Sequence, residues 1–267
     1  MERNHMMVKD ENYQGHPVFS DLVRYEAFYK SLASSVFQWV SLGTRSLGNI
    51  DSYVFSSIEG TLASIQTVLR DGRINDAYAL LRKYYDSGII NIYTHLYLED
   101  NVSIQNFIVK QIDDWLHGKA KLPEYRVMSQ YIRNAASVKP ITDLLFKDER
   151  YKTIRKRCND HTHYNFYRNV LLNDNRILLP ARGKVLEQLA EDIRDVFILH
   201  LAYMFYAWDH YLMSIDHVTC LDCGITPEPD SQYWVAPFAQ DIFDQTVKQY
   251  RPDIAAEIKQ NTKMQLA

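Results

Sequence analysis

The sequence predicts an all-α protein, and three observations support this fold class. Gly and Pro together account for 17 of the 267 residues, which is about half of their usual share. Apolar residues recur at steps of three and four through most of the chain, which is the spacing of one helical face. No tract alternates apolar and polar residues between turn residues, so we expect no sheet. The expected architecture is an antiparallel helical bundle with additional short helices.

The first half of the chain contains the helices that should begin the bundle. One helical face runs through residues 21–47, and a second through 51–69. The second helix should end at Gly72, because glycine commonly follows the last helical residue. A third helix should cover 74–96. Since only a few residues join the second helix to the third, these two should pack antiparallel.

The second half of the chain should add one long helix and several short ones. Pro180 precedes the longest helical pattern. Its apolar part, from Val196 to Trp208, is too short to span a bilayer and is typical of a buried core helix. The helices expected in this half are residues 103–116, 124–133, 148–163, 181–217, 241–250 and 252–259.

These patterns divide the chain into three parts. Residues 1–18 should be a loose leader, 19–224 the helical bundle, and 225–267 an irregular aromatic tail whose short helices pack on the bundle. The leader is polar and lacks the apolar run of a secretion signal. Three cysteines cannot form a disulfide framework. We therefore expect a cytoplasmic protein that does not associate with membranes.

Charge points to one segment of the chain as a candidate site. The formal net charge is −3, so a nucleic-acid-binding surface would have to be a local patch. Between Lys147 and Arg157 there are six Lys or Arg residues and two acidic ones, a local balance of 6 − 2 = +4. Two His, two Asn and one Asp follow within eight residues. This is the densest group of acid/base and phosphate-binding side chains in the chain.

A helical wheel divides this segment into two faces. The face that should be buried contains Tyr151, Ile154, Cys158 and His161. The face that should be exposed contains Lys152, Lys156, Asn159 and His163. We therefore expect His161 to point inward and His163 to point toward solvent.

The residue types in this segment suit RNA cleavage without a metal ion. A histidine can remove the proton of the 2′-hydroxyl, which then attacks the phosphate, and an arginine can stabilise the crowded phosphate. The product would be a cyclic phosphate. The alternative interpretation is a solvated helical face, with His161 as a satisfied core histidine.

The segment also resembles a known family. Five residues separate Arg157 from His163 and Arg155 from His161, and this spacing on a late helix resembles the R-x4–6-H motif of HEPN domains. The tract A-Y-A-L-L-R-K-Y-Y-D-S-G-I-I-N-I-Y, residues 77–93, is similar to the long core helix of bacterial HEPN-like proteins. Cys158 departs from the pattern, since many active members have a polar residue directly after the arginine.

The resemblance implies a homodimer in which the two motifs face each other and form one RNase site without metal or cofactor. Carried over to this sequence, Arg157 and His163 would be the catalytic pair, with Asn159 and Asp160 as polar neighbours. The residues that would contact nucleic acid are Lys152, Arg155, Lys156 and His161. Many members act in toxin–antitoxin or phage-defence systems, so the expected partners are RNA or a nucleotide and an antitoxin-like protein.

Three other patterns carry weaker expectations. Cys220 and Cys223 have the spacing of half a zinc site, but a second pair is missing, so we expect a turn and no metal. The acidic residues between 187 and 195 should be solvated. The aromatic run 233–238 should pack back on the bundle. The alternative function is a non-catalytic interaction module that uses the apolar stretch 196–208 and this aromatic tail.

Overall fold

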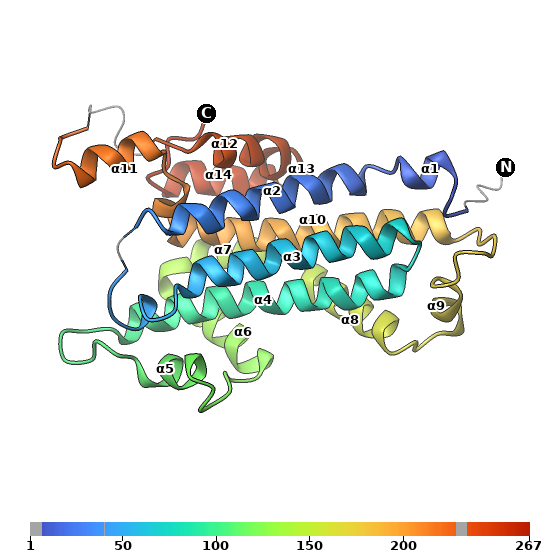
Figure 1. Ribbon diagram of the computed structural model, residues 1–267, viewed down its shortest axis with the longest axis horizontal. Coiled ribbons are helices and arrows are strands. Elements are labelled where there is room, and N and C mark those ends of the chain that lie inside the picture. The colour runs from blue at the N-terminus through green and yellow to red at the C-terminus, as the bar shows by residue number, and fades with distance from the viewer. Residues whose placement is uncertain (1–6, 40, 228–233) are drawn as a thin grey trace. The chain divides into compact units, whose positions relative to one another are not determined.

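The computed structural model describes residues 7–39, 41–227 and 234–267. Within these ranges every regular element is a helix (Figure 1), and one isolated antiparallel bridge joins Met213 to Val235. The predicted all-α class is therefore confirmed for the described residues. None of the helices described is both long enough and apolar enough to cross a membrane.

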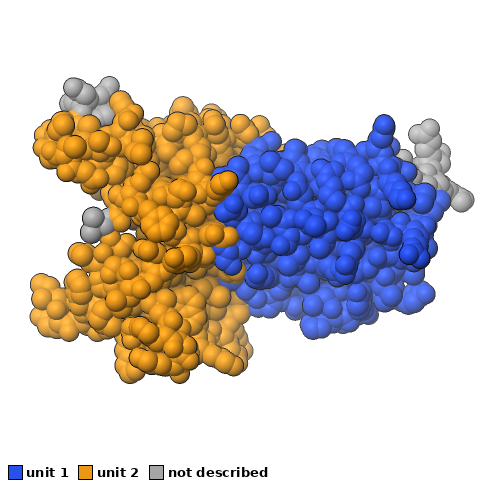
Figure 2. All heavy atoms as spheres, in the orientation of Figure 1, with its two compact units in different colours: residues 1–27, 57–86, 148–197 blue, residues 28–56, 87–147, 198–267 orange. Residues whose placement is uncertain are grey.

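The chain separates into two compact units (Figure 2). Unit 1 comprises Met1–Ala27, Ser57–Asp86 and Asp148–Phe197, and unit 2 comprises Phe28–Ser56, Ser87–Lys147 and Ile198–Ala267. Four of the five boundaries fall inside the long helices, which are α2 (Val18–Val36), α3 (Ile50–Arg70), α4 (Ile74–Asn101) and α10 (Arg182–Ala207), and the fifth falls between Lys147 and Asp148. This division differs from the expected leader, single bundle and tail, because each of those end segments groups with one of the two units.

Unit 1 includes the first residues described. Helix α1 (Glu11–Gln14) lies within the stretch expected to be loose. Tyr13 is fully buried, and its hydroxyl donates a hydrogen bond to the backbone oxygen of Leu69 at 2.8 Å. Residues 7–18 are therefore folded against α3, in contrast to the expectation; residues 1–6 lie outside the described part of the chain.

The turn between α3 and α4 begins where the sequence predicts it. Gly72 has a φ of +78°, and its N–H donates to Leu69 O at 2.8 Å while Arg73 N–H donates to Val68 O at 2.9 Å. These bonds satisfy the last carbonyls of α3. Because the turn is this short, α3 and α4 run antiparallel, as predicted.

Other helix pairs in unit 1 are not all antiparallel. Helix α8 (Arg150–Thr162) runs antiparallel to α4, since Asp86 pairs with Arg155 while Asn75 pairs with His161. By contrast, α2 and α10 run in the same direction. The ring of Tyr25 stacks on Phe197 at 4.0 Å, and His16, just before α2, pairs with Glu187 at 2.9 Å. The long connection before α10 permits this parallel pairing.

Unit 2 contains the remaining short elements. Two contacts hold the C-terminal tail on this unit. Nη2 of Arg251 donates to the backbone oxygen of Leu144 at 2.9 Å. The ring of Phe238 lies 5.7 Å from that of Phe28. The elements described in unit 2 are η1 (Gly43–Arg45), α5 (Lys110–Leu116), α6 (Tyr125–Asn134), η2 (Ala136–Val138), α7 (Lys139–Leu145), η3 (Asp209–Leu212), α11 (Ile215–Asp222), α12 (Pro237–Ile242), the π-helical turn η4 (Phe243–Val247), α13 (Lys248–Tyr250) and α14 (Pro252–Asn261).

Three helices are shorter than the apolar pattern predicts. Helix α2 ends at Val36 instead of residue 47, α5 begins at Lys110 instead of 103, and α10 ends at Ala207 instead of 217. At the second of these, Ser103 and Asn106 exchange backbone hydrogen bonds in a turn. Small polar side chains favour such turns over helix. The apolar stretch 196–208 is buried, as predicted for a core helix.

Candidate functional site

Helix α8 has the two faces that its sequence predicts. Tyr151, Ile154, Cys158 and His161 are buried, whereas Lys152, Lys156, Asn159 and His163 are exposed. The apolar surroundings of the buried face raise the pKa of the Cys158 thiol to about 12. Because a thiol with this pKa stays protonated at neutral pH, Cys158 acts as a packing residue rather than as a nucleophile.

Arg157 is held by a buried carboxylate. Its Nε and Nη2 each donate to one oxygen of Asp192 on α10 at 2.7 Å. Asp192 is 1% exposed and also accepts from the hydroxyl of Tyr78 at 3.3 Å. The hydrogen bonds to Asp192 raise the pKa of Arg157. The bidentate pair fixes the guanidinium and leaves Nη1 as the group that can contact a ligand.

His161 is a neutral histidine with a defined tautomer. Its ring stacks on that of Tyr78, with centroids 4.0 Å apart, and its Nδ1 lies 2.6 Å from Oδ1 of Asn75. The side-chain amide of Asn75 donates to the backbone oxygen of Asn169, so Oδ1 is the acceptor and Nδ1 of His161 carries the hydrogen. Burial lowers the pKa of His161 to about 4. At pH 7 the ring is therefore neutral, with its lone pair on Nε2.

Arg157 and His161 line the same pocket in unit 1. The pocket has a volume of about 310 Å³ and lies among α8, α9 (Tyr167–Leu171) and the first turns of α10. Its other charged lining residues are Arg168, Lys184 and Asp160. Asp192, which pairs with Arg157 from outside the lining, adds a second carboxylate, so three cations against two carboxylates leave an excess of one positive charge, which favours an anionic ligand.

The pocket also has an exposed aromatic side chain. Phe166 is 50% exposed, and the guanidinium carbon of Arg168 lies 5.4 Å from its ring centroid. An aromatic ring beside arginine is a common arrangement for stacking an unpaired base next to its phosphate. The pocket therefore combines an acid/base group, cations and a stacking surface.

Of the other predicted catalytic residues, Asp160 lines the pocket, whereas His163 and Asn159 do not. His163 is exposed, occupies the C-cap of α8 and is not among the residues that line the pocket. The side-chain oxygen of Asn159 accepts a hydrogen bond from Arg82. Asp160 lines the pocket, and its carboxylate accepts from Asn165 at 2.8 Å. The R-x5-H spacing occurs twice, as Arg157–His163 and as Arg155–His161. The pocket contains the arginine of the first pair and the histidine of the second.

Of the four predicted nucleic-acid contacts, Lys152 and Lys156 lie on the solvated face of α8, Arg155 is partly buried, and His161 lines the pocket. Arg155 pairs with Asp86, and Lys152 pairs with Glu149 at 2.7 Å. Lys156 is exposed. Since none of the three lysine and arginine side chains lines the pocket, they are available for long-range attraction of an anion rather than for contact within it.

Sequence reasoning missed several residues of this site. Asp192 was expected to be solvated, but it is buried under Arg157. Asn75 and Tyr78 come from α4, and Arg168 comes from a helix that the pattern did not predict. A polar Asn in the first turn of an apolar helix was the one available signal. The partners of Arg157 and His161 are 35 and 86 residues away in the sequence, so the helical wheel could not pair them.

The two remaining sequence motifs gave no site. Cys220 is partly buried and Cys223 is exposed. Among the residues described, no group of three or more His, Cys, Asp or Glu side chains could hold a metal ion. Of the aromatic run, Tyr233 lies outside the described residues, Trp234 is 43% exposed, and Phe238 packs against Phe28.

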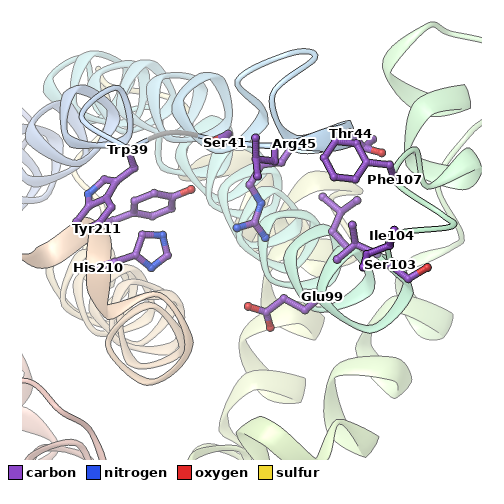
Figure 3. A pocket seen from close by; sticks show the side chains of 13 residues that line it. Trp39, Ser41, Thr44, Arg45, Glu99, Ser103, Ile104, Phe107, His210 and Tyr211 are labelled. Carbon is purple, nitrogen blue, oxygen red and sulfur yellow. The ribbon is translucent and has the colours of Figure 1, made fainter. Parts of the chain in front are cut away.

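A second pocket lies in unit 2, in a region where the sequence predicted no site. It has a volume of about 470 Å³ and is lined by Trp39 and by residues from the segments 41–45, 98–107 and 210–211 (Figure 3). Its polar residues include Arg45, Glu99 and His210.

Comparison with known proteins adds no assignment. No family model matches the chain, and neither the search of curated proteins nor the search of solved structures found a match.

Proposed function

We propose that this chain is a HEPN-like protein that binds RNA at the unit 1 pocket and cleaves it without a metal ion. His161 is the acid/base group, and Arg157, Arg168 and Lys184 bind the phosphate. Phe166 stacks on a neighbouring base. This proposal keeps the reaction expected from the sequence but moves the acid/base role from His163 to His161.

The proposed reaction proceeds through the 2′-hydroxyl of the RNA itself. Nε2 of His161 takes the 2′-hydroxyl proton as the 2′-oxygen bonds to phosphorus. The bond from phosphorus to the 5′-oxygen then breaks, and the protonated His161 returns the proton to this leaving oxygen. The products are a 2′,3′-cyclic phosphate and a 5′-hydroxyl. Nη1 of Arg157 and the side chains of Arg168 and Lys184 balance the charge that develops on the phosphate.

One observation carries this proposal. A neutral histidine with its lone pair on Nε2 and an arginine fixed by a buried carboxylate line one pocket that has an excess of positive charge. Each feature has a structural explanation when taken alone. Together they supply a base, a positioned cation and electrostatic attraction for a phosphodiester, within the reach of one ligand.

The proposal predicts which variants lose RNA cleavage. Purified wild type, His161→Gln and His163→Gln would be incubated with RNA in chelator, and new termini analysed by mass spectrometry. We expect 2′,3′-cyclic phosphate ends from wild type and His163→Gln, and at least a hundredfold loss in His161→Gln, the usual minimum for an acid/base group. Circular dichroism would verify that both variants fold. Activity lost in His163→Gln but kept in His161→Gln, or absent in wild type, would contradict the proposal.

We also propose that the chain works as a homodimer with a toxin or phage-defence role, as its resemblance to HEPN proteins implies. Expression of the wild type in a bacterial host should then arrest growth, and His161→Gln should relieve the arrest. Light scattering of the purified chain would measure the dimer. Growth that is equal for wild type and His161→Gln would count against the toxic role.

The alternative, a non-catalytic interaction module, loses one of its two expected surfaces. The apolar stretch 196–208 was to form the contact, but Phe197, Leu201 and Phe205 are fully buried. Trp234 remains exposed in the tail. Other exposed apolar residues gather around the unit 2 pocket.

A further inference from the structure

The pocket of unit 2 is built by two loops that are fixed to each other. The N–H of Val109 donates to Oγ1 of Thr44 at 2.7 Å, which joins the segment after α4 to η1. Gly43 has a φ of +62°, and a Cβ at this position would lie 2.4 Å from the backbone oxygen of Phe107. This close approach requires glycine. These contacts hold the two loops of the pocket wall together.

The outer wall is apolar and faces solvent. Ile104 is 94% exposed and Leu42 is 68% exposed, and Val102 and Phe107 are each about half exposed. Apolar side chains that gather around a pocket of about 470 Å³ provide the burial that a small organic ligand needs.

The inner end of the pocket carries an ordered polar row. Nη2 of Arg45 lies 2.9 Å from Nδ1 of His95, and Nε2 of His95 lies 2.8 Å from Oε1 of Glu99. Because arginine can act only as a donor, Nδ1 of His95 is the acceptor, and Nε2 carries the hydrogen that Glu99 accepts. A guanidinium and a carboxylate are thus held on either side of one imidazole ring.

A buried carboxylate, Asp51, positions Arg45 at one end of the row Arg45–His95–Glu99. Asp51 is 4% exposed and lies 4.0 Å from Nε of Arg45. It accepts from the hydroxyl of Tyr211 at 2.8 Å and from the side-chain amide of Asn91 at 2.9 Å. Arg45 is therefore positioned by Asp51 and His95, and its guanidinium points into the space between the aromatic side chains and Glu99 (Figure 3).

The charges at this end of the pocket disfavour an anion. Arg45 supplies one positive charge, and the carboxyl groups of Glu99 and Asp51 lie close to it. His95 donates to Glu99 as a neutral ring. A phosphate or carboxylate ligand would meet Glu99 as well as Arg45, so a neutral ligand that accepts from one and donates to the other fits better.

Aromatic side chains form the opposite side of the pocket. The ring of His210 lies 5.2 Å from Trp39 and 4.2 Å from Tyr211. Figure 3 shows these three side chains together across from Glu99 and Ile104. The plane of His210 makes an angle of 80° with Trp39 and of 54° with Tyr211, and Tyr211 is only 2% exposed, so a flat aromatic ligand stacks on Trp39 or on His210 and not on all three rings.

From these contacts we propose that the unit 2 pocket binds a neutral heteroaromatic molecule with an amide-like edge, the chemistry of a guanine base. The ligand oxygen accepts from Arg45, the adjacent ring N–H donates to Glu99, and the ring stacks on the side chain of Trp39 or His210. Arginine is a frequent partner of the O6 and N7 acceptors of guanine. This site has no residue in common with the unit 1 pocket.

Calorimetry of the full chain with guanosine tests this inference. Adenosine is the matched ligand, because it lacks the carbonyl and the ring N–H of the amide-like edge. We expect guanosine to bind at least about tenfold more tightly than adenosine, the discrimination that one unsatisfied hydrogen-bonding group produces. Benzoate, an apolar anion, should bind more weakly than guanosine.

Two variants separate the site from the fold. Glu99→Gln keeps the side-chain shape and should weaken guanosine binding about tenfold or more, whereas the exposed Glu11→Gln should leave it unchanged. His161→Gln should also leave it unchanged. The proposal would be overturned if guanosine and adenosine bound equally, or if benzoate bound more tightly than guanosine. It would also be overturned if guanosine did not bind and the chain formed a dimer that Ile104→Lys abolishes.

Discussion

Arg182 shows how one buried side chain shapes the unit 1 pocket. It is 0% exposed, and in the described structure its hydrogen bonds go to backbone oxygens, including those of Asp174 at 2.6 Å and Ile177 at 3.3 Å. Burial lowers its pKa. These bonds hold the segment between α9 and α10, and Leu172 and Leu179 of that segment line the pocket.

Replacing Arg182 should therefore destabilise the fold. Arg182→Met keeps the volume but removes the donor from four backbone carbonyls, two of them in buried hydrogen bonds, and a buried carbonyl left unsatisfied costs about 1–3 kcal/mol. We expect a loss of about 3 kcal/mol in the free energy of unfolding, measured by urea denaturation. Arg176→Met, at an exposed position, should change it by less than about 0.5 kcal/mol. A similar loss in both variants would refute the role assigned to Arg182.

At the scale of the element, the turn between α3 and α4 depends on Gly72. A Cβ there would lie 2.3 Å from Cγ2 of Val8, on a backbone with a φ of +78°. Gly118 has a similar φ of +67° but no atom within 4 Å of its Cβ position. The two glycines thus separate the cost of backbone conformation from the cost of steric overlap.

Alanine substitutions should reveal this difference. Gly118→Ala should cost about 1 kcal/mol, the usual penalty of a left-handed conformation, and Gly72→Ala should cost at least about 1 kcal/mol more. Adding Val8→Ala should recover part of the extra cost, which a double-mutant cycle measures. If Gly72→Ala and Gly118→Ala cost the same, the contact with Val8 is unimportant.

The faces of helices were predictable from the sequence, but helix ends and long-range pairs were not. The steps of three and four correctly identified Tyr151, Ile154 and Cys158 as buried residues of α8. The end of α10 was missed because tertiary contacts override the local pattern. Trp208 packs edge-on against His95 at 4.1 Å, and the following 3₁₀ turn η3 brings Tyr211 to Asp51.

This helix end also explains why the unit 2 pocket was not predicted. Arg45, Glu99 and His210 are separated by more than 50 residues at each step. Arg45 and His210 lie on segments expected to be plain helix, and Glu99 lies just beyond the expected end of another. Nothing in their local sequence signals a shared site. The unit 1 pocket was partly predicted because Arg157 and His161 lie one turn apart on one helix.

At the scale of the whole molecule, buried neutral histidines predict sensitivity to acid. Burial lowers the pKa of His161 and His210 to about 4 and that of His200 to about 3. Their unfolded value is about 6.5. Because the folded pKa is the lower one, the unfolded chain binds more protons, and the stability present above pH 6.5 is lost as the pH falls toward 4.

Urea denaturation at pH 7 and pH 4.5 should show this loss, about 2 kcal/mol for each histidine. Buried carboxyls with a raised pKa, such as Asp195, act with the opposite sign, so a variant must isolate the histidine contribution. His161→Gln should reduce the difference between the two pH values by about 2 kcal/mol. An unchanged difference in this variant would show that His161 is not neutral in the folded protein.

The most direct test of the central claim is to observe the two histidines of α8 while RNA binds. The ring nitrogens of His161 and His163 would be followed by NMR during titration with an oligonucleotide in which 2′-O-methyl groups prevent cleavage. We predict that Nε2 of His161 shifts and that its pKa rises as the phosphate enters the pocket, while His163 remains unchanged. A shift at His163 with none at His161 would contradict the account.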